Sequence, residues 1–136
     1  MKYEITKENK ILFGIKLFKI KALRNFGNIK INDLGGWIEK EKNLSQDDNA
    51  WVSGDARVYD NARISGDAWI SGDAWIYGDA RISGNAWIYD NAQIYGDARI
   101  SGDARIYDNA QIYGDARISG DARISGNAWI SGDTWV

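Results

Sequence analysis

The chain has 136 residues, 44% of them hydrophobic, and a formal net charge of −2 at pH 7, which is enough for one small folded unit. It has no cysteine, which excludes disulfides, thiolate chemistry and thiolate metal sites. No apolar stretch reaches the length of a signal sequence or a membrane span, so we expect a cytoplasmic protein without a membrane segment.

Residues 1–47 form a basic segment in which β-strand patterns predominate. They carry ten Lys/Arg against six Asp/Glu, whereas residues 48–136 carry seven Arg against thirteen Asp. Alternation of apolar and polar residues predicts two or three short strands, within Tyr3–Thr6, Ile11–Leu23 and Asn28–Ile31. Two glycine-containing pairs are predicted as turns, Gly27-Asn28 and Gly35-Gly36.

From Ala50 onward a six-residue unit, Ala-x-Ile/Val-Ser/Tyr-Gly/Asp-Asp/Asn, repeats fifteen times without an insertion, the last time as a half unit. In an extended chain the Ala and Ile/Val side chains face one way, and the residues that follow each of them face the other. The Gly-Asp, Asp-Asn or Gly-Asn pair tolerates a positive φ and predicts a corner. Residues 90–107 and 108–125 agree at 17 of 18 positions, so three units form one triangular coil. The period predicts a solenoid of about five such coils.

The repeat resembles the hexapeptide repeat of left-handed parallel β-helix proteins. The pattern is carried by Ile64, Gly66, Asp67, Ala68 and Ile70 and extends over residues 48–136. The resemblance implies an all-β, left-handed parallel β-helix. An open first coil would expose apolar side chains and a strand edge, so we predict that residues 1–47 are a small N-terminal β cap.

The segment before the repeat is similar to the leader of small bacterial and phage hexapeptide-repeat proteins, mostly of unknown function. The similarity lies in Ile20–Arg24 and Asp33–Glu39. Some proteins of that group carry a nominal acyltransferase label. Hexapeptide acyltransferases use a histidine as general base, and the carbonic-anhydrase branch holds a metal with three histidines, but this chain has no histidine. We therefore expect no catalytic residue, no metal and no cofactor, and no acetyl transfer from acetyl-CoA.

Residues eighteen apart lie in one column, so the position after each alanine forms one column on each of three faces. Face 1 carries Trp51, Trp69, Trp87, Arg105 and Arg123. Face 2 carries Arg57, Trp75, Gln93, Gln111 and Trp129, beside Tyr59, Tyr77, Tyr95, Tyr113 and Ser131. Face 3 carries Arg63, Arg81, Arg99, Arg117 and Trp135, beside Ser65, Ser83, Ser101 and Ser119.

The aromatic columns have two interpretations. Rings that repeat at the strand spacing stack and stiffen the sheet, or they form a docking surface, because Trp and Tyr are frequent in interface hot spots. Self-association is the form of docking that we expect. The candidate residues for partner or oligomer binding are Trp51, Trp69, Trp75, Tyr77, Trp87, Tyr95, Tyr113, Trp129, Trp135 and Val136.

The arginine column of face 3 also has two interpretations. Four like charges at strand spacing repel, so they require flanking carboxylates or a bound anion. The flanking carboxylates are Asp79, Asp97 and Asp115 on one side and Asp67, Asp103 and Asp121 on the other. The alternative is an anion-binding stripe for phosphate or a sulfated polymer, formed by Arg63, Arg81, Arg99 and Arg117. The acidic solenoid argues against general nucleic-acid affinity, and the corner Asp and Asn residues are expected to form turns rather than a calcium site.

These features predict a non-catalytic binding or scaffold protein that self-associates and presents flat faces to a macromolecular partner. One expected mode is an end-to-end dimer that buries the last coil with Trp135 and Val136. The other is side-by-side packing of the face with Trp51, Trp69 and Trp87. Two alternatives stay open: a phage or prophage inhibitor or adaptor that docks on a host protein with partial nucleic-acid mimicry, and a degenerate hexapeptide acyltransferase. An ice-binding role is discounted, because the chain has only two threonines, Thr6 and Thr134.

Overall fold

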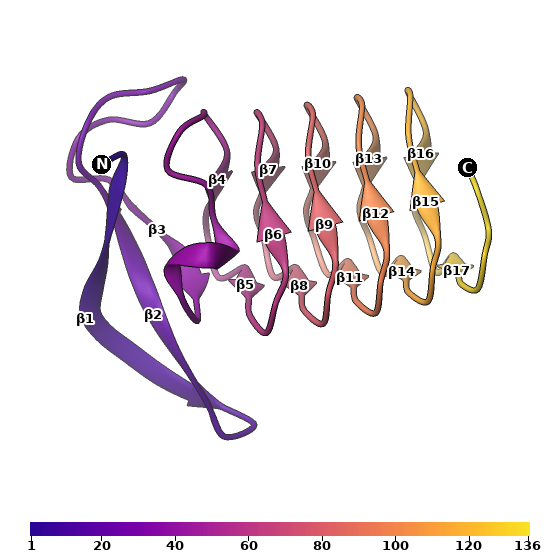
Figure 1. Ribbon diagram of the computed structural model, residues 1–136, viewed down its shortest axis with the longest axis horizontal. Coiled ribbons are helices and arrows are strands. Elements are labelled where there is room, and N and C mark those ends of the chain that lie inside the picture. Colours follow the sequence, from indigo (N-terminus) through magenta and orange to yellow (C-terminus); the bar gives the residue numbers. More distant parts are fainter.

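The computed structural model describes residues 1–136 as an all-β solenoid of about five triangular coils. The coils stack into a prism, with a β-hairpin crossing one end and the C-terminus at the other (Figure 1). The one helical element is a single 3-10 turn, η1 (Glu41–Asn43). The fold predicted from the repeat is confirmed. None of the elements is a helix of the length and apolarity needed to cross a bilayer.

Each repeat unit contributes one strand of two residues. These strands are β4 (Trp51–Val52), β5 (Arg57–Val58), β6 (Arg63–Ile64), β7 (Trp69–Ile70), β8 (Trp75–Ile76), β9 (Arg81–Ile82), β10 (Trp87–Ile88), β11 (Gln93–Ile94), β12 (Arg99–Ile100), β13 (Arg105–Ile106), β14 (Gln111–Ile112), β15 (Arg117–Ile118), β16 (Arg123–Ile124) and β17 (Trp129–Ile130). They form one parallel sheet per face, and each strand pairs with the strand eighteen residues away, as with Trp69 and Trp87. The three predicted columns are therefore confirmed.

The strands have only two residues each, because the chain already bends into the corner after each Ile or Val. Hydrogen bonding between coils nevertheless continues through the corners. Asp55 donates its backbone N–H to the carbonyl of Gly72 (3.0 Å), and Asp67 donates to Gly84 (2.8 Å). Each coil is thus bonded to the next along faces and corners alike.

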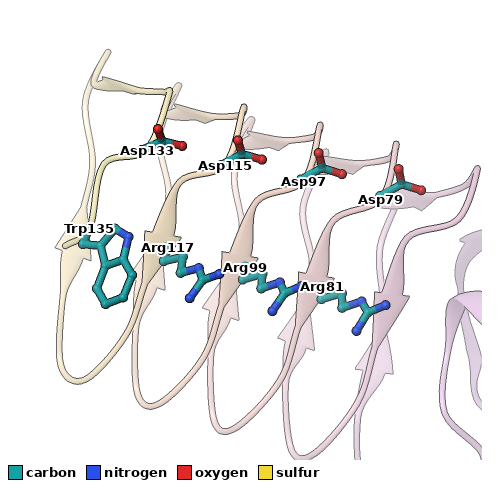
Figure 2. A pocket seen from close by; sticks show the side chains of 8 residues that line it. All are labelled: Asp79, Arg81, Asp97, Arg99, Asp115, Arg117, Asp133 and Trp135. Carbon is teal, nitrogen blue, oxygen red and sulfur yellow. The ribbon is translucent and has the colours of Figure 1, made fainter.

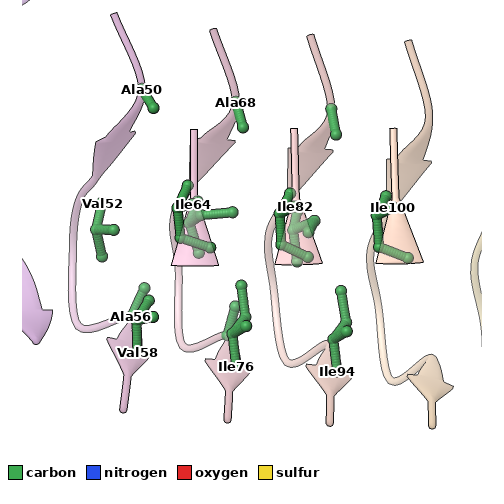
Figure 3. Close-up of a cluster of buried hydrophobic side chains, with 14 of the residues drawn as sticks. Ala50, Val52, Ala56, Val58, Ile64, Ala68, Ile76, Ile82, Ile94 and Ile100 are labelled. Atoms are coloured by element: carbon green, nitrogen blue, oxygen red, sulfur yellow. The ribbon is translucent and has the colours of Figure 1, made fainter. Parts of the chain in front are cut away.

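The interior of the prism is filled by the Ala and Ile/Val columns (Figure 3). Ile94 is fully buried, Ile100 is 1% exposed, and alanines such as Ala98 between them are fully buried. The predicted division between inward and outward positions is therefore confirmed.

The first residue of each corner adopts a positive φ, as the repeat predicts. Gly66 has φ 68°, and Asp90 occupies the same place with φ 59°. Aspartate at this place also bonds to the next coil: the Asp108 Oδ2 accepts the backbone N–H of Gly126 at 3.0 Å. The carboxylate thus satisfies a corner amide.

The cap is built from β1 (Tyr3–Leu12), β2 (Ile15–Ala22) and β3 (Leu34–Ile38). β1 and β2 form an antiparallel hairpin, and β2 pairs antiparallel with β3. β3 then pairs in parallel with β5, with Trp37 opposite Arg57, so the cap extends the sheet of face 2. The parallel ladder therefore begins inside the segment 1–47.

Of the two turns predicted in the cap, Gly27-Asn28 is confirmed, with φ 51° at Gly27, and Gly35-Gly36 is wrong. The strand predicted within Asn28–Ile31 is also absent, because Asn28 belongs to this turn and Ile29 forms only a bridge with Phe26. Gly35 and Gly36 lie inside β3, not in a turn. A Cβ on Gly35 would lie 2.5 Å from the Val52 carbonyl oxygen, and one on Gly36 would lie 2.7 Å from that of Ala56, so glycine is needed here for close approach to the first coil. The hairpin turn is at Phe13 and Gly14, whose φ values are 50° and 79°.

The cap is fixed to the solenoid by Lys2, a lysine with no exposed surface. Its Nζ donates to the Ala50 carbonyl at 2.6 Å and lies 3.7 Å from Asp48 Oδ1. Asp48 Oδ2 in turn accepts the backbone N–H of Gly66 at 2.6 Å. Burial lowers the pKa of Lys2 to about 8, against the opposing effect of the Asp48 carboxylate.

Candidate functional site

Face 1 presents less aromatic surface than the sequence predicts. Trp51 is 1% exposed, because Tyr3 and Phe26 of the cap pack edge-on against its ring at 6.4 and 5.3 Å. The interpretation of Trp51 as a docking residue is therefore wrong. Trp69 is half-buried and packs against the core, and Trp87 is the exposed tryptophan of this face.

Face 2 carries the most regular aromatic surface. Its tyrosine rings lie 4.9–5.0 Å apart with planes within 5° of parallel, and they are Tyr59, Tyr77, Tyr95 and Tyr113. The predicted stacking is confirmed. Burial, with the neighbouring Tyr77, raises the pKa of Tyr59 to about 12. A second stack of two rings, Tyr89 and Tyr107 at 5.0 Å, lies on face 1. The same eighteen-residue spacing of Tyr89 and Tyr107 in the sequence is the signal that indicates this stack.

The cap covers one end of face 2 and leaves the other open. The Phe13 ring at the hairpin tip lies 5.8 Å from the Trp75 ring. The Arg57 guanidinium lies 4.8 Å from the centre of the same Trp75 ring. Trp75 is half-buried between them, whereas Trp129 at the far end is 67% exposed. Tyr77, Tyr95 and Tyr113 are half-buried, and together with Trp129 they form what we call the open aromatic strip.

Face 3 carries two parallel rows of opposite charge (Figure 2). A groove of about 590 Å³ runs along it, lined by Asp79, Arg81, Asp97, Arg99, Asp115, Arg117, Asp133 and Trp135. No Asp–Arg ion pair forms between the rows, since the ion pairs of the structure are Lys2–Asp48 and Lys21–Glu4. The aspartates accompany the arginines without contact.

Trp135 and Val136 lie at the far end of face 3. They are 73% and 47% exposed, and the Arg117 guanidinium lies 5.1 Å over the Trp135 ring. Trp135 therefore closes the groove at this end.

Near the cap, the same face has a smaller recess of about 200 Å³. It is lined by Lys40, Lys42, Asn61, Arg63, Asp79 and Arg81. Lys40 and Lys42 are not among the residues predicted from the sequence, because they precede the repeat. The usable signal is Leu44, which pairs with Ile64 and so places these lysines beside Arg63.

The acidic corners do not converge on a common point. No group of three or more Asp, Glu, His or Cys side chains is arranged to hold a metal ion. Where corner side chains contact each other, one side chain of a coil hydrogen-bonds to one side chain of the next coil. An example is the 3.1 Å hydrogen bond that Asn85 Nδ2 donates to Asp103 Oδ1.

Comparison with known proteins identifies the repeat. A family model described as the YdcK beta solenoid repeat matches residues 56–72, 74–90, 92–108, 110–123 and 122–136. The first four matched segments begin eighteen residues apart, which is one coil, and together the segments cover more than half of the chain. No curated protein matches the chain.

Proposed function

The chain belongs to the YdcK beta solenoid repeat family, and from this premise we propose that it is a non-catalytic binding or scaffold protein. It self-associates and presents flat aromatic and Arg–Ser faces to a macromolecular partner. We include in the proposal that the repeat is of the hexapeptide class with left-handed winding, which its Ala-x-Ile/Val pattern supports.

The observation that carries the proposal is the open aromatic strip. Its tyrosines are held parallel by stacking at 4.9–5.0 Å, so they form a flat surface that needs little ordering when a partner binds. Trp129 extends the strip as an exposed anchor, and Trp is the residue type most often found in interface hot spots. The cap covers Trp75 but leaves this part of face 2 free.

A second copy of the chain fits this strip in shape. Five coils at about 4.8 Å and six residues at about 3.3 Å give a flat face of roughly 24 by 20 Å. That is about half of the surface that one partner contributes to a standard stable interface. Side-by-side packing of two such faces therefore belongs to the weak class, with micromolar association.

The absence of suitable titratable side chains supports the non-catalytic part of the proposal. With no histidine and no cysteine, no side chain has an ordinary pKa near neutrality. Burial brings the pKa of Lys2 to about 8, but this side chain is fully enclosed between the cap and the first coil. A substrate has no access to it.

The test is a sedimentation-velocity series from 1 to about 100 μM, a range that brackets micromolar association. We expect concentration-dependent self-association of the unmodified protein. The triple variant Tyr77→Ser/Tyr95→Ser/Tyr113→Ser removes the tyrosine rings of the strip. Serine is the replacement because the same column already has serine at position 131. It should remain monomeric.

The matched control is Trp87→Arg on face 1, which copies Arg105 of the same column and should associate like the unmodified protein. A monomer at every concentration would defeat self-association. Cross-linking in cells, followed by mass spectrometry, then decides between a scaffold and a docking protein. A single stoichiometric foreign partner would favour an inhibitor or adaptor.

A further inference from the structure

The recess at the cap end of face 3 concentrates positive charge. Of its six lining residues, four are cationic and one is acidic, an excess of three positive charges. Lys40 is placed in the recess by a 3.4 Å contact of its Nζ with the Asn61 Oδ1. In Figure 2 the arginine side chains of face 3 run toward the cap end, so Arg81 extends toward the coil of Arg63.

None of the four cations has an acidic partner within the structure. The two ion pairs involve Lys2 and Lys21, and neither Arg63 nor Arg81 lies over an aromatic ring. The nearest acids along the chain are occupied elsewhere. Glu39 Oε1 accepts the backbone N–H of Asp60 at 2.8 Å, and Glu41 Oε1 accepts Gln46 Nε2 at 2.9 Å.

The rest of face 3 shows what is different about this coil. Two residues before each later arginine of this column stands an aspartate, as with Asp79 before Arg81 and Asp97 before Arg99. Before Arg63 the same corner place holds Asn61. The carboxylate at the corner of Arg63 is instead Asp60, one residue earlier. Its Oδ2 accepts the backbone N–H of Gly78 in the next coil at 3.2 Å, and it forms no ion pair with Arg63.

The two lysines are held in place by a buried asparagine. Asn43 has no exposed surface, and its Oδ1 accepts the backbone N–H groups of Glu39 and Lys40 at 3.1 and 2.9 Å. Its Nδ2 donates to the carbonyls of Ala62 (2.9 Å) and Asp60 (3.2 Å). The hydrogen bonds of Asn43 thus fix the segment that carries Lys40 and Lys42 to the coil that carries Arg63. The cations are therefore positioned before any ligand binds.

We propose that this recess is a binding site for a diphosphate group. A phosphoryl group carries about −1.5 to −2 charges at neutral pH, so two linked groups balance an excess of about three positive charges. Arginine and lysine are the side chains that bind phosphate most strongly, through charge-assisted hydrogen bonds. At about 200 Å³ the recess suits such a group rather than a whole drug-sized ligand. The site goes beyond self-association and does not depend on it.

The experiment is calorimetric titration of the full chain with inorganic pyrophosphate at pH 7 and low salt. We expect saturable binding to one site. Arg63→Gln should weaken it about tenfold or more, because a charge-assisted hydrogen bond is lost. Arg117→Gln should leave it within about twofold, a range far below the loss of one charged bond. Glutamine already occupies the equivalent place on face 2, as Gln93 and Gln111, so both variants are expected to fold.

A third variant gives this coil the chemistry of its neighbours. Asn61→Asp places a carboxylate beside Arg63, as in every later coil of the face, and should also weaken binding about tenfold. Thermal melts of all variants check that the fold is retained. Titration with a nucleoside diphosphate identifies the source of the diphosphate group. Tighter binding of the nucleoside diphosphate than of pyrophosphate indicates a diphosphate ester as the ligand, and tighter binding of pyrophosphate indicates the free anion.

Three results would overturn the site. They are the absence of saturable pyrophosphate binding, equal weakening by Arg63→Gln and Arg117→Gln, and sulfate binding as strong as pyrophosphate binding, which would mark an adventitious ion only. The tyrosine variants of face 2 should bind pyrophosphate normally. The proposed diphosphate site and the proposed self-association are therefore tested independently of each other.

Discussion

At the scale of single residues, Lys2 links the stability of the fold to pH. Its pKa is about 8 in the folded protein and 10.5 as an ordinary value, so the folded state releases the proton first as pH rises. The unfolded chain then binds more protons, and the free energy of unfolding increases with pH. The destabilisation by the buried charge is complete below about pH 8 and declines between about 8 and 10.5.

We expect the urea midpoint of the protein to rise between pH 8 and 9.5, and Lys2→Met to remove most of this rise. Lys10, whose pKa burial also lowers, contributes the remainder. This pH interval lies below the ordinary tyrosine pKa of 10.0. Burial raises the pKa of Tyr3 and Tyr59, so their ionisation in the unfolded chain lowers the free energy of unfolding only at higher pH. Lys21→Met, at a partly exposed lysine that pairs with Glu4 at 3.5 Å, is the control and should keep the rise. An identical pH profile for Lys2→Met and the unmodified protein would contradict the assignment.

A second residue-scale prediction concerns the interior. Ile94→Asp should unfold the prism, because it removes about 1.5–3 kcal/mol of apolar burial and encloses a carboxylate without a partner. Ser101→Thr, at an outward position, should leave the melting temperature nearly unchanged. Circular dichroism melts measure both variants. A folded Ile94→Asp protein with an unchanged melting temperature would show that this column is not interior.

At the scale of elements, the tyrosine stack joins strands of face 2 that lie eighteen residues apart in the chain. Tyr95 stacks on Tyr77 and Tyr113, so Tyr95→Ser removes two stacked pairs, worth about 1–3 kcal/mol together. Tyr107→Ser removes only the pair with Tyr89, worth about 0.5–1.5 kcal/mol. Urea unfolding should therefore show about twice the loss for Tyr95→Ser. Equal losses would mean that the rings stack without stabilising the fold.

The elements of the repeat could be predicted from the sequence, and those of the cap only in part. In the repeat, each strand is fixed by neighbours of nearly the same sequence, so one unit such as 62–67 specifies the others. In the cap, Gly35 and Gly36 read as a turn because the contact that requires them, with Val52 and Ala56, joins a non-repeating segment to the solenoid. Local patterns carry no information about that register.

The candidate sites divide in the same way. The columns of Tyr77 and Arg99 follow from the period alone, and the structure has both. The burial of Trp51 and the position of Lys40 and Lys42 beside Arg63 depend on where the cap folds back. They could not be predicted without the tertiary arrangement.

At the scale of the whole molecule, the proposal predicts no acyltransferase activity. The solenoid offers no histidine and no cysteine, and its buried amine Lys2 is out of reach. Incubation with acetyl-CoA and an amine or sugar acceptor should release no thiol above the rate without protein. Since the protein has no thiol of its own, the assay has no background from the chain. Sustained thiol release with turnover would overturn the non-catalytic assignment.

The near-identity of residues 90–107 and 108–125 makes the length of the prism an adjustable quantity. Deletion of 90–107 joins Tyr89 to Asp108 and restores almost the same sequence on the far side of the junction. The cap, the recess beside Arg63 and the distal coils would keep their contacts, while the distance between the two ends would shorten by one strand spacing, about 4.8 Å. The distance between the cap and the C-terminal coil can therefore be changed in steps of one whole coil.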